Sequence, residues 1–184
     1  MTKKVAQELI DATPKKLRGA FMKRRNLKGF KEAYEGKSKF YRKAMAGLQR
    51  LPKMDAAIWD RQGIYRESGG DQRRAPFRGG QSAGVRRIMD AIDSAADRKF
   101  GSIRNAIRQS PDRKISLASL HGLQAAVDAN KVKGKIEDIE RTDEVEVPAV
   151  VRFKGKLYLV DGYHTCTALK LGGVKSVVAS VAAL

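Results

Sequence analysis

The spacing of apolar residues divides the chain into a helical first part and a later part in which strands and helices alternate. Between Phe40 and Leu48, and again between Val85 and Ile107, apolar residues recur at steps of three and four, which is typical of amphipathic helices. Gly101 is a candidate break in the second helix, which ends before Pro111. Narrower stripes at residues 13–21 and 27–36 predict two short helices nearer the start.

From Lys114 onward the pattern changes to short apolar runs that alternate with helical spacing. Lys154-Gly155, between two β-rich runs, is a two-residue hairpin signal. In chain order we expect a strand and a turn within 114–124, a helix capped by Asp128 or Asn130, strands within 145–153 and 156–161, a short helix that ends at Gly172-Gly173, and a last strand at 174–181.

These patterns predict an α+β fold, in which a helical and basic N-terminal region precedes a small α/β domain. Residues 66–84 are rich in Gly, Ser, Arg and Pro and poor in apolar residues, which is typical of a flexible linker. We therefore expect four units: a basic helical region at 1–65, the linker at 66–84, a long helix at 85–113 and the α/β domain at 114–184.

A polar cluster occupies residues 161–167, where the strand at 156–161 is expected to end. It contains a histidine, a cysteine and two threonines, and the following helix is expected to begin after Ala168. Strand–helix joints of α/β proteins often hold ligands. The pattern alone leaves three interpretations open: the cluster performs chemistry, binds an anion, or caps the helix.

Charge changes the picture, because the net charge of +18 is unevenly distributed. Residues 1–54 contain 16 Lys and Arg against 4 Asp and Glu, whereas residues 115–184 contain 9 against 8. A basic first part joined to a nearly neutral domain predicts an arm that binds a polyanion, and nucleic acid is the polyanion we favour. The alternatives are a solvated surface and a face matched to an acidic protein. The candidate nucleic-acid contacts are Lys15, Lys16, Arg18, Lys23, Arg24 and Arg25.

Composition excludes several other classes. The single cysteine, Cys166, excludes an internal disulfide and suits a reducing compartment. No run of residues approaches the roughly 18 apolar residues that a membrane helix needs. The first residues also lack the apolar stretch of a secretory signal. We therefore expect a soluble intracellular protein with no membrane partner.

Residues 114–184 resemble the ParB-like nuclease family, also called the ParB/sulfiredoxin domain. That family opens with a leucine and a glutamine ahead of a helix, as Leu120 and Gln124 do here, and continues with a proline-led strand and a hairpin. It then has the pattern DGxHRxxA and a helix that ends in glycine. The residues that match this pattern, in order, are Asp161, Gly162, His164, Ala168 and Gly173.

The resemblance implies a ParB/sulfiredoxin-like α/β fold with a phosphate-handling pocket at the strand–helix joint. Helix N–H groups and the positive end of the helix dipole favour an anion there, and Gly162 lets the backbone approach it closely. The family's arginine is Thr165 here, which removes a permanent charge and a bidentate donor. Sulfiredoxin activity is not implied, because its cysteine immediately precedes the histidine, where this chain has Tyr163.

The resemblance also suggests roles for residues of the cluster. His164 would be a general acid or base, and Asp161 would assist it or hold a metal. The candidate phosphate- or nucleotide-binding residues are Gly162, Tyr163, Thr165, Thr167 and Gln124. The structural alternatives are that His164 and Asp161 hold the turn together, that the threonines cap the helix, and that Tyr163 packs on the sheet. The sequence shows no metal site, and the cofactor stays open, with a divalent metal expected for a nuclease.

Three function classes follow from the resemblance and the charge. The one we favour is a nucleic-acid-associated protein of the phage or plasmid nuclease type that acts on phosphodiesters. The alternatives are a non-catalytic virion or DNA-organising protein that retains the fold, and a nucleotide-gated DNA clamp. The expected partners are nucleic acid, DNA in particular, and other proteins of a phage or partition assembly. The expected location is the cytoplasm or a virion.

Overall fold

The computed structural model describes residues 33–34, 37–54, 70–80 and 84–184. The helix expected at 13–21 and the candidate contacts Lys15 to Arg25 lie outside the described residues. The helix expected at 27–36 lies mostly outside them, and its described residues, Ala33–Tyr34, form a short strand instead. The described elements, in chain order, are β1 (Ala33–Tyr34), β2 (Lys37–Ser38), α3 (Lys39–Arg50), β3 (Gln72–Arg74), α5 (Val85–Phe100), α6 (Ile103–Arg108), β4 (Asp112–Ser116), the 3-10 helix η1 (Leu117–Ser119), β5 (Leu120–Gly122), β6 (Ala126–Asp128), α7 (Ala129–Thr142), β7 (Ala149–Phe153), β8 (Lys156–Asp161), α8 (Tyr163–Leu171) and β9 (Ser176–Ala183).

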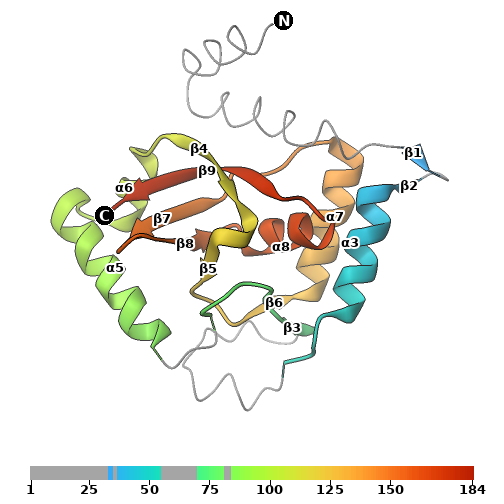
Figure 1. Cartoon of the computed structure of the whole chain (residues 1–184), viewed down its shortest axis with the longest axis horizontal. Coiled ribbons are helices and arrows are strands. Elements are labelled where there is room, and N and C mark those ends of the chain that lie inside the picture. The colour runs from blue at the N-terminus through green and yellow to red at the C-terminus, as the bar shows by residue number, and fades with distance from the viewer. Residues whose placement is uncertain (1–32, 35–36, 55–69, 81–83) are drawn as a thin grey trace, which may run out of the picture.

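A mixed five-stranded sheet lies at the centre of an α+β fold, with helices on both of its faces (Figure 1). Its strand order is β4-β9-β7-β8-β5. β7 runs parallel to β9 and antiparallel to β8, and β5 is an edge strand parallel to β8. No helix among the described residues is long and apolar enough to cross a membrane.

Two apolar layers hold the helices on the sheet. One layer joins α3, α7 and α8 to the sheet and contains Phe40, Ile136 and Leu159. The other joins α5 and α6 to the opposite face and contains Ile92, Ala106 and Tyr158. Strand β9 has side chains in both layers, which explains its nearly continuous apolar sequence, because both of its faces are covered.

Helix α3 confirms the stripe between Phe40 and Leu48 and belongs to the same core as the C-terminal elements. Phe40 and Leu48 are buried in the layer that includes α7 and α8. At its N-terminus Ser38 donates from its backbone N–H to the carboxylate of Glu140 on α7, with a nitrogen–oxygen distance of 2.8 Å. Residues 39–50 therefore pack into the same hydrophobic core as the elements within residues 112–184.

Residues 70–80, which we expected in a flexible linker, are an ordered part of the fold. β3 pairs antiparallel with β6, and the N–H of Ala75 donates to the carbonyl of Ala125. Ala75 and Phe77 are buried. Backbone hydrogen bonds and these two apolar side chains fix a stretch that is otherwise polar, so its composition gave the wrong prediction for this part of the linker.

The helix expected at 85–113 is instead two helices and the start of a strand. Helix α5 ends at Gly101, whose φ is 73°, and Ser102 caps α6 through its side-chain oxygen. Two other predictions are confirmed. Asp128 caps α7 by accepting from the N–H of Asn130, and β7 and β8 form a hairpin around Lys154-Gly155.

Candidate functional site: the β8–α8 junction

The junction between β8 and α8 depends on Gly162. Its φ is 88°, in the left-handed region that favours glycine, and a Cβ atom on it would lie 2.8 Å from Cβ of Pro148. The chain therefore turns directly from strand into helix, and α8 begins at Tyr163 rather than after Ala168. The expected start of this helix was wrong, because the polar cluster forms its first turns.

Tyr163 connects α8 to three other parts of the fold. Its hydroxyl donates to the carbonyl of Leu159 on β8 at 2.7 Å and accepts from the N–H of Leu123, just after β5. Its ring packs edge-on against Phe77 of the segment 70–80. Burial raises the pKa of the Tyr163 hydroxyl well above its usual value. Tyr163 therefore occupies a structural position in which its hydroxyl is already bonded on both sides.

His164 links the start of α8 to the start of α7. Its Nε2 atom accepts a hydrogen bond from the N–H of Asp128, the residue that caps α7, at 3.3 Å. An imidazole nitrogen that accepts a hydrogen bond carries no proton, so the neutral ring has its proton on Nδ1. The side chain is half-buried.

Asp161 lies at the exposed end of β8. Its Oδ1 atom accepts from the N–H of Gly162 at 2.7 Å, so the carboxylate also stabilises the turn. Asp161 and His164 lie on either side of the turn at Gly162, and each makes a hydrogen bond to the backbone. Each of them has a structural contact that its alternative interpretation anticipated.

Thr165 and Thr167 do not cap α8, contrary to the structural alternative proposed for them. The N-cap residue is Gly162, which makes no side-chain cap, and both threonines are buried. Among the described residues neither hydroxyl has a hydrogen-bond partner. Thr165 therefore places a short buried hydroxyl at the position where the family has a long cation.

Two further side chains of the motif region are Gln124, which is partly buried, and Cys166. The amide of Gln124 donates to the carbonyl of Ala126 at 2.9 Å. Cys166 is buried, and burial together with the charge of Asp161 raises the pKa of its thiol to about 12, so the thiol stays protonated. Among the described residues no group of three or more His, Cys, Asp or Glu side chains could hold a metal ion.

Lys170 is the cation that α8 itself supplies, and it lies in the last turn of that helix. Its Nζ atom donates to the carbonyl of Pro76 at 2.5 Å and lies 5.1 Å from the centroid of the Phe77 ring. Burial and the nearby charge of Arg78 lower the pKa of Lys170. This lysine fastens the segment 70–80 to α8, at the end of the helix away from Gly162.

A cluster of basic side chains at the β5 edge was not predicted from the sequence. We call Arg78, His121 and Lys156 the β5-edge cluster. The backbones of Arg78 and His121 form an isolated parallel β-bridge. The carbonyl of Arg78 accepts a hydrogen bond from the N–H of Gly122 at 2.7 Å. His121 lies opposite Tyr158 in the register of β5 and β8, two residues from Lys156 along β8. Burial, and then the charges of Lys156 and Arg78, lower the pKa of His121.

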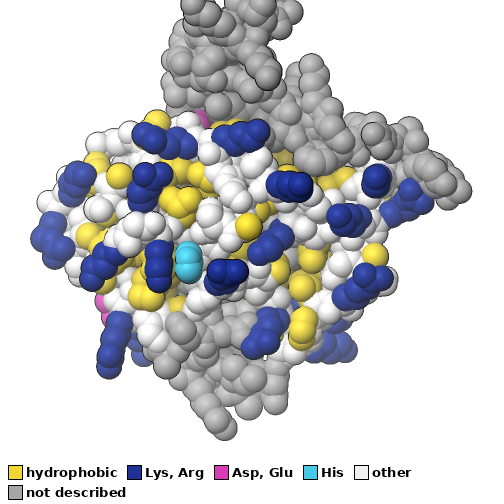
Figure 2. All heavy atoms as spheres, in the orientation of Figure 1, with side chains coloured by type: hydrophobic (Ala, Val, Ile, Leu, Met, Phe, Trp, Pro, Cys, Tyr) yellow, Lys and Arg dark blue, Asp and Glu magenta, His cyan; other side chains and the backbone are white. Residues whose placement is uncertain are grey.

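The β5-edge cluster belongs to a wider basic surface. Figure 2 shows Lys and Arg side chains spread over the face that contains β4 and β5, with acidic side chains visible only at its rim. Arg78 and Lys156 are both exposed. The three members come from separate parts of the sequence, and the only local signal was an arginine beside two glycines at 78–80.

Among the comparisons with known proteins, a family match covers the C-terminal part of the chain. Residues 113–183 match the family model described as "Putative ParB-like nuclease". This part of the chain is therefore a ParB-like domain, as the motif predicted. No curated protein matches the chain.

One solved structure that the chain resembles is the crystal structure of sulfiredoxin from Arabidopsis thaliana. The identity is 22%, and the match covers 40% of this chain and 86% of that chain, with a TM-score of 0.36. At this TM-score the likeness supports no statement about activity.

The close approach of Gly162 to Pro148 yields a prediction about stability. Gly162→Ala should destabilise the fold more than Gly155→Ala. Both glycines have positive φ, so both variants incur about 1 kcal/mol of left-handed strain. Only at Gly162 does the new methyl group also collide with Pro148, which adds about 1–3 kcal/mol. Urea denaturation measures both, and equal losses would show that the Pro148 contact does not constrain the junction.

Proposed function

We propose that this protein binds nucleic acid, and DNA in particular, through the basic face of its ParB-like fold. The observation that carries the proposal is the β5-edge cluster and the basic surface around it (Figure 2). Among the described residues, the side chains of Arg78 and Lys156 have no hydrogen-bond or ion-pair partner, so their charges are available to an external anion. The basic segment that contains Lys15 to Arg25 would add contacts to the same polymer.

Phosphate backbones suit such a surface. Each cation that neutralises a phosphate releases condensed counterions, which gives affinity without reading base sequence. A face with few carboxylates avoids like-charge repulsion with the polymer. This supports a role in holding or organising nucleic acid, which fits the DNA-organising alternative.

A nuclease is the second candidate, because Asp161 is exposed and lies close in the chain to the half-buried His164. If the junction cuts phosphodiesters, His164 would be the general acid or base, with Asp161 or a divalent metal assisting it. The contact of His164 with the N–H of Asp128 and the buried Thr165 make the junction a structural joint as well. For this reason we place binding ahead of cleavage. The clamp alternative would require a nucleoside triphosphate at the same joint.

Removal of the two exposed cations should weaken DNA binding and its dependence on salt. The double variant Arg78→Ala/Lys156→Ala is expected to reduce the slope of log affinity against log salt by about 1.8, if each cation neutralises one phosphate. The measurement is fluorescence anisotropy of a labelled duplex with the full chain. The matched control is Lys133→Ala/Lys135→Ala on α7, whose lysines already pair with Glu137 and Glu146. Equal slopes in both variants would refute a role for the β5-edge cluster.

His121 should make DNA binding depend on pH. Because its pKa is lowered in the free protein, it is neutral at pH 7 and gains a proton as the pH falls below its usual value of 6.5. A nearby phosphate stabilises the protonated form, so affinity should rise with falling pH in the wild type and rise less in His121→Gln. Stability of the free protein should change in the opposite sense, since the unfolded chain binds that proton more readily. Identical pH profiles of binding would contradict the placement of DNA at this edge.

The nuclease candidate has its own test. It predicts nicking of supercoiled plasmid with Mg²⁺ or Mn²⁺ and loss of nicking in His164→Ala, with DNA binding retained. Since that variant also removes the acceptor for the Asp128 N–H, its thermal unfolding must be measured beside it. Nicking that persists in a folded His164→Ala protein would remove His164 from the mechanism. If the wild-type protein binds DNA but does not nick plasmid, the nuclease candidate is rejected and only the binding function remains.

A further inference from the structure

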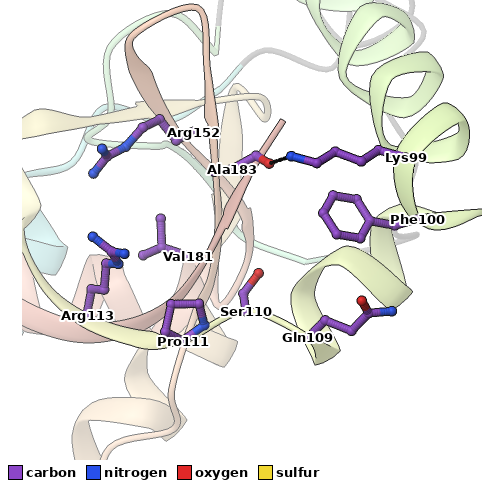
Figure 3. A pocket seen from close by; sticks show the side chains of 9 residues that line it. All are labelled: Lys99, Phe100, Gln109, Ser110, Pro111, Arg113, Arg152, Val181 and Ala183. Atoms are coloured by element: carbon purple, nitrogen blue, oxygen red, sulfur yellow. Dashed lines mark hydrogen bonds between the residues drawn. The ribbon is translucent and has the colours of Figure 1, made fainter.

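A cavity of about 250 Å³ opens beside the C-terminal end of β9 (Figure 3). It lies at the other end of β7 from the junction. Asp161 pairs with Ala149 at one end of that strand, and Arg152 pairs with Ala183 at the other. The walls of the cavity come from the end of α5, the link between α6 and β4, and strands β4, β7 and β9. The residues of the family motif do not line it.

Two arginines face the cavity from the strands on either side of β9. Arg113 is on β4 and Arg152 on β7, and Figure 3 shows both on the same side of β9 as Val181. Both are exposed. Among the described residues neither guanidinium has a hydrogen-bond or ion-pair partner. The fold thus holds two unneutralised cations on one concave surface.

The edge of β9 is open beyond Val181. β4 pairs with β9 as far as Asp112 and Ser180, and the N–H of Val181 still donates to the carbonyl of Pro111 at 3.1 Å. On the other side, the N–H of Leu184 donates to the carbonyl of Arg152, which is parallel pairing, so the N–H and carbonyl of Ala183 point away from β7 and toward the cavity. The carbonyl of Ala183 accepts from Nζ of Lys99 at 3.2 Å, as Figure 3 shows. The N–H of Ala183 adds a backbone donor to the cations.

The chemistry of the cavity is that of a phosphate site. Lys99, Gln109, Arg113 and Arg152 line it, and Figure 3 shows the two arginines on one side of β9 and Lys99 and Gln109 on the other. Among the described residues no Asp or Glu lines it. Guanidinium groups and backbone N–H donors suit an anion with several oxygens, and phosphate accepts from arginine in bidentate fashion. We propose that this cavity binds a phosphate ester and so provides a further phosphate contact for the nucleic acid proposed above. If the phosphate belongs to a nucleic-acid strand, this inference rests on the proposed nucleic-acid binding. A free nucleotide carries the same phosphate group and could bind without that function.

The test uses the full chain and the side-chain Nε–H signals of arginine in NMR spectra. Three probes are titrated separately: inorganic phosphate, a nucleoside monophosphate and a short DNA oligonucleotide. The signals of Arg113 and Arg152 should shift and saturate with the oligonucleotide. Those of Arg98 and Arg104, which are exposed on α5 and α6 outside the cavity, should stay nearly unchanged.

Affinity gives the second readout. Arg113→Ala/Arg152→Ala should weaken oligonucleotide binding by roughly tenfold more than the charge-matched control Arg98→Ala/Arg104→Ala at low salt. All four positions are exposed, so both variants should fold, which thermal unfolding checks. Equal losses in the two variants would overturn the inference, because the cavity would then contribute only general charge.

The probes also separate this inference from the proposed function. If DNA binds but the Arg113 and Arg152 signals do not move with any probe, the cavity site is wrong and the basic face stands. If DNA does not bind but the monophosphate shifts these signals, the nucleic-acid function is wrong and the cavity is a nucleotide site. Shifts with the oligonucleotide at lower concentration than with the monophosphate identify a strand phosphate as the ligand.

Discussion

The contact between Gly162 and Pro148 is the constraint on which the junction depends. Because Gly162 has no side chain and a left-handed φ, β8 can end against Pro148 and α8 can begin at the next residue. Pro148 is itself fixed to the sheet, since its carbonyl accepts from the N–H of Ser180 on β9. From this start, the hydroxyl of Tyr163 reaches Leu123 and the imidazole of His164 reaches Asp128. The first turn of α8 thereby joins the sheet to α7.

This joint uses polar groups that the family motif would offer to a ligand. His164 accepts a backbone hydrogen bond, Asp161 stabilises its own turn, and Thr165 lies buried where the family has an arginine. The exposed cations without a described partner on which the proposals rest lie elsewhere, at the β5-edge cluster and around the cavity at the end of β9. Charge and exposure together therefore favour binding of a polyanion on the basic face over phosphate chemistry centred on Thr165.

Local patterns predicted much of the C-terminal architecture. The cap at Asp128, the hairpin at Lys154-Gly155 and the glycine of the motif each depend on neighbouring residues and could be inferred from them. The segment 70–80 could not, because its order comes from pairing with β6 and from Phe77 packing on Tyr163. The same holds for the β5-edge cluster, whose members meet only through strand pairing. The start of α8 was misplaced because a run of polar residues concealed a buried helix face.

We propose that the described residues 70–80 and 84–184, and not only the basic segment at residues 1–32, contact the nucleic acid. Amide ¹H–¹⁵N correlation spectra of the full chain, titrated with a DNA duplex, test this directly. Within the described residues, we expect the largest shifts at the backbone amides of Arg78, His121 and Lys156. Shifts confined to residues 1–32, with these three amides unchanged at saturation, would contradict it.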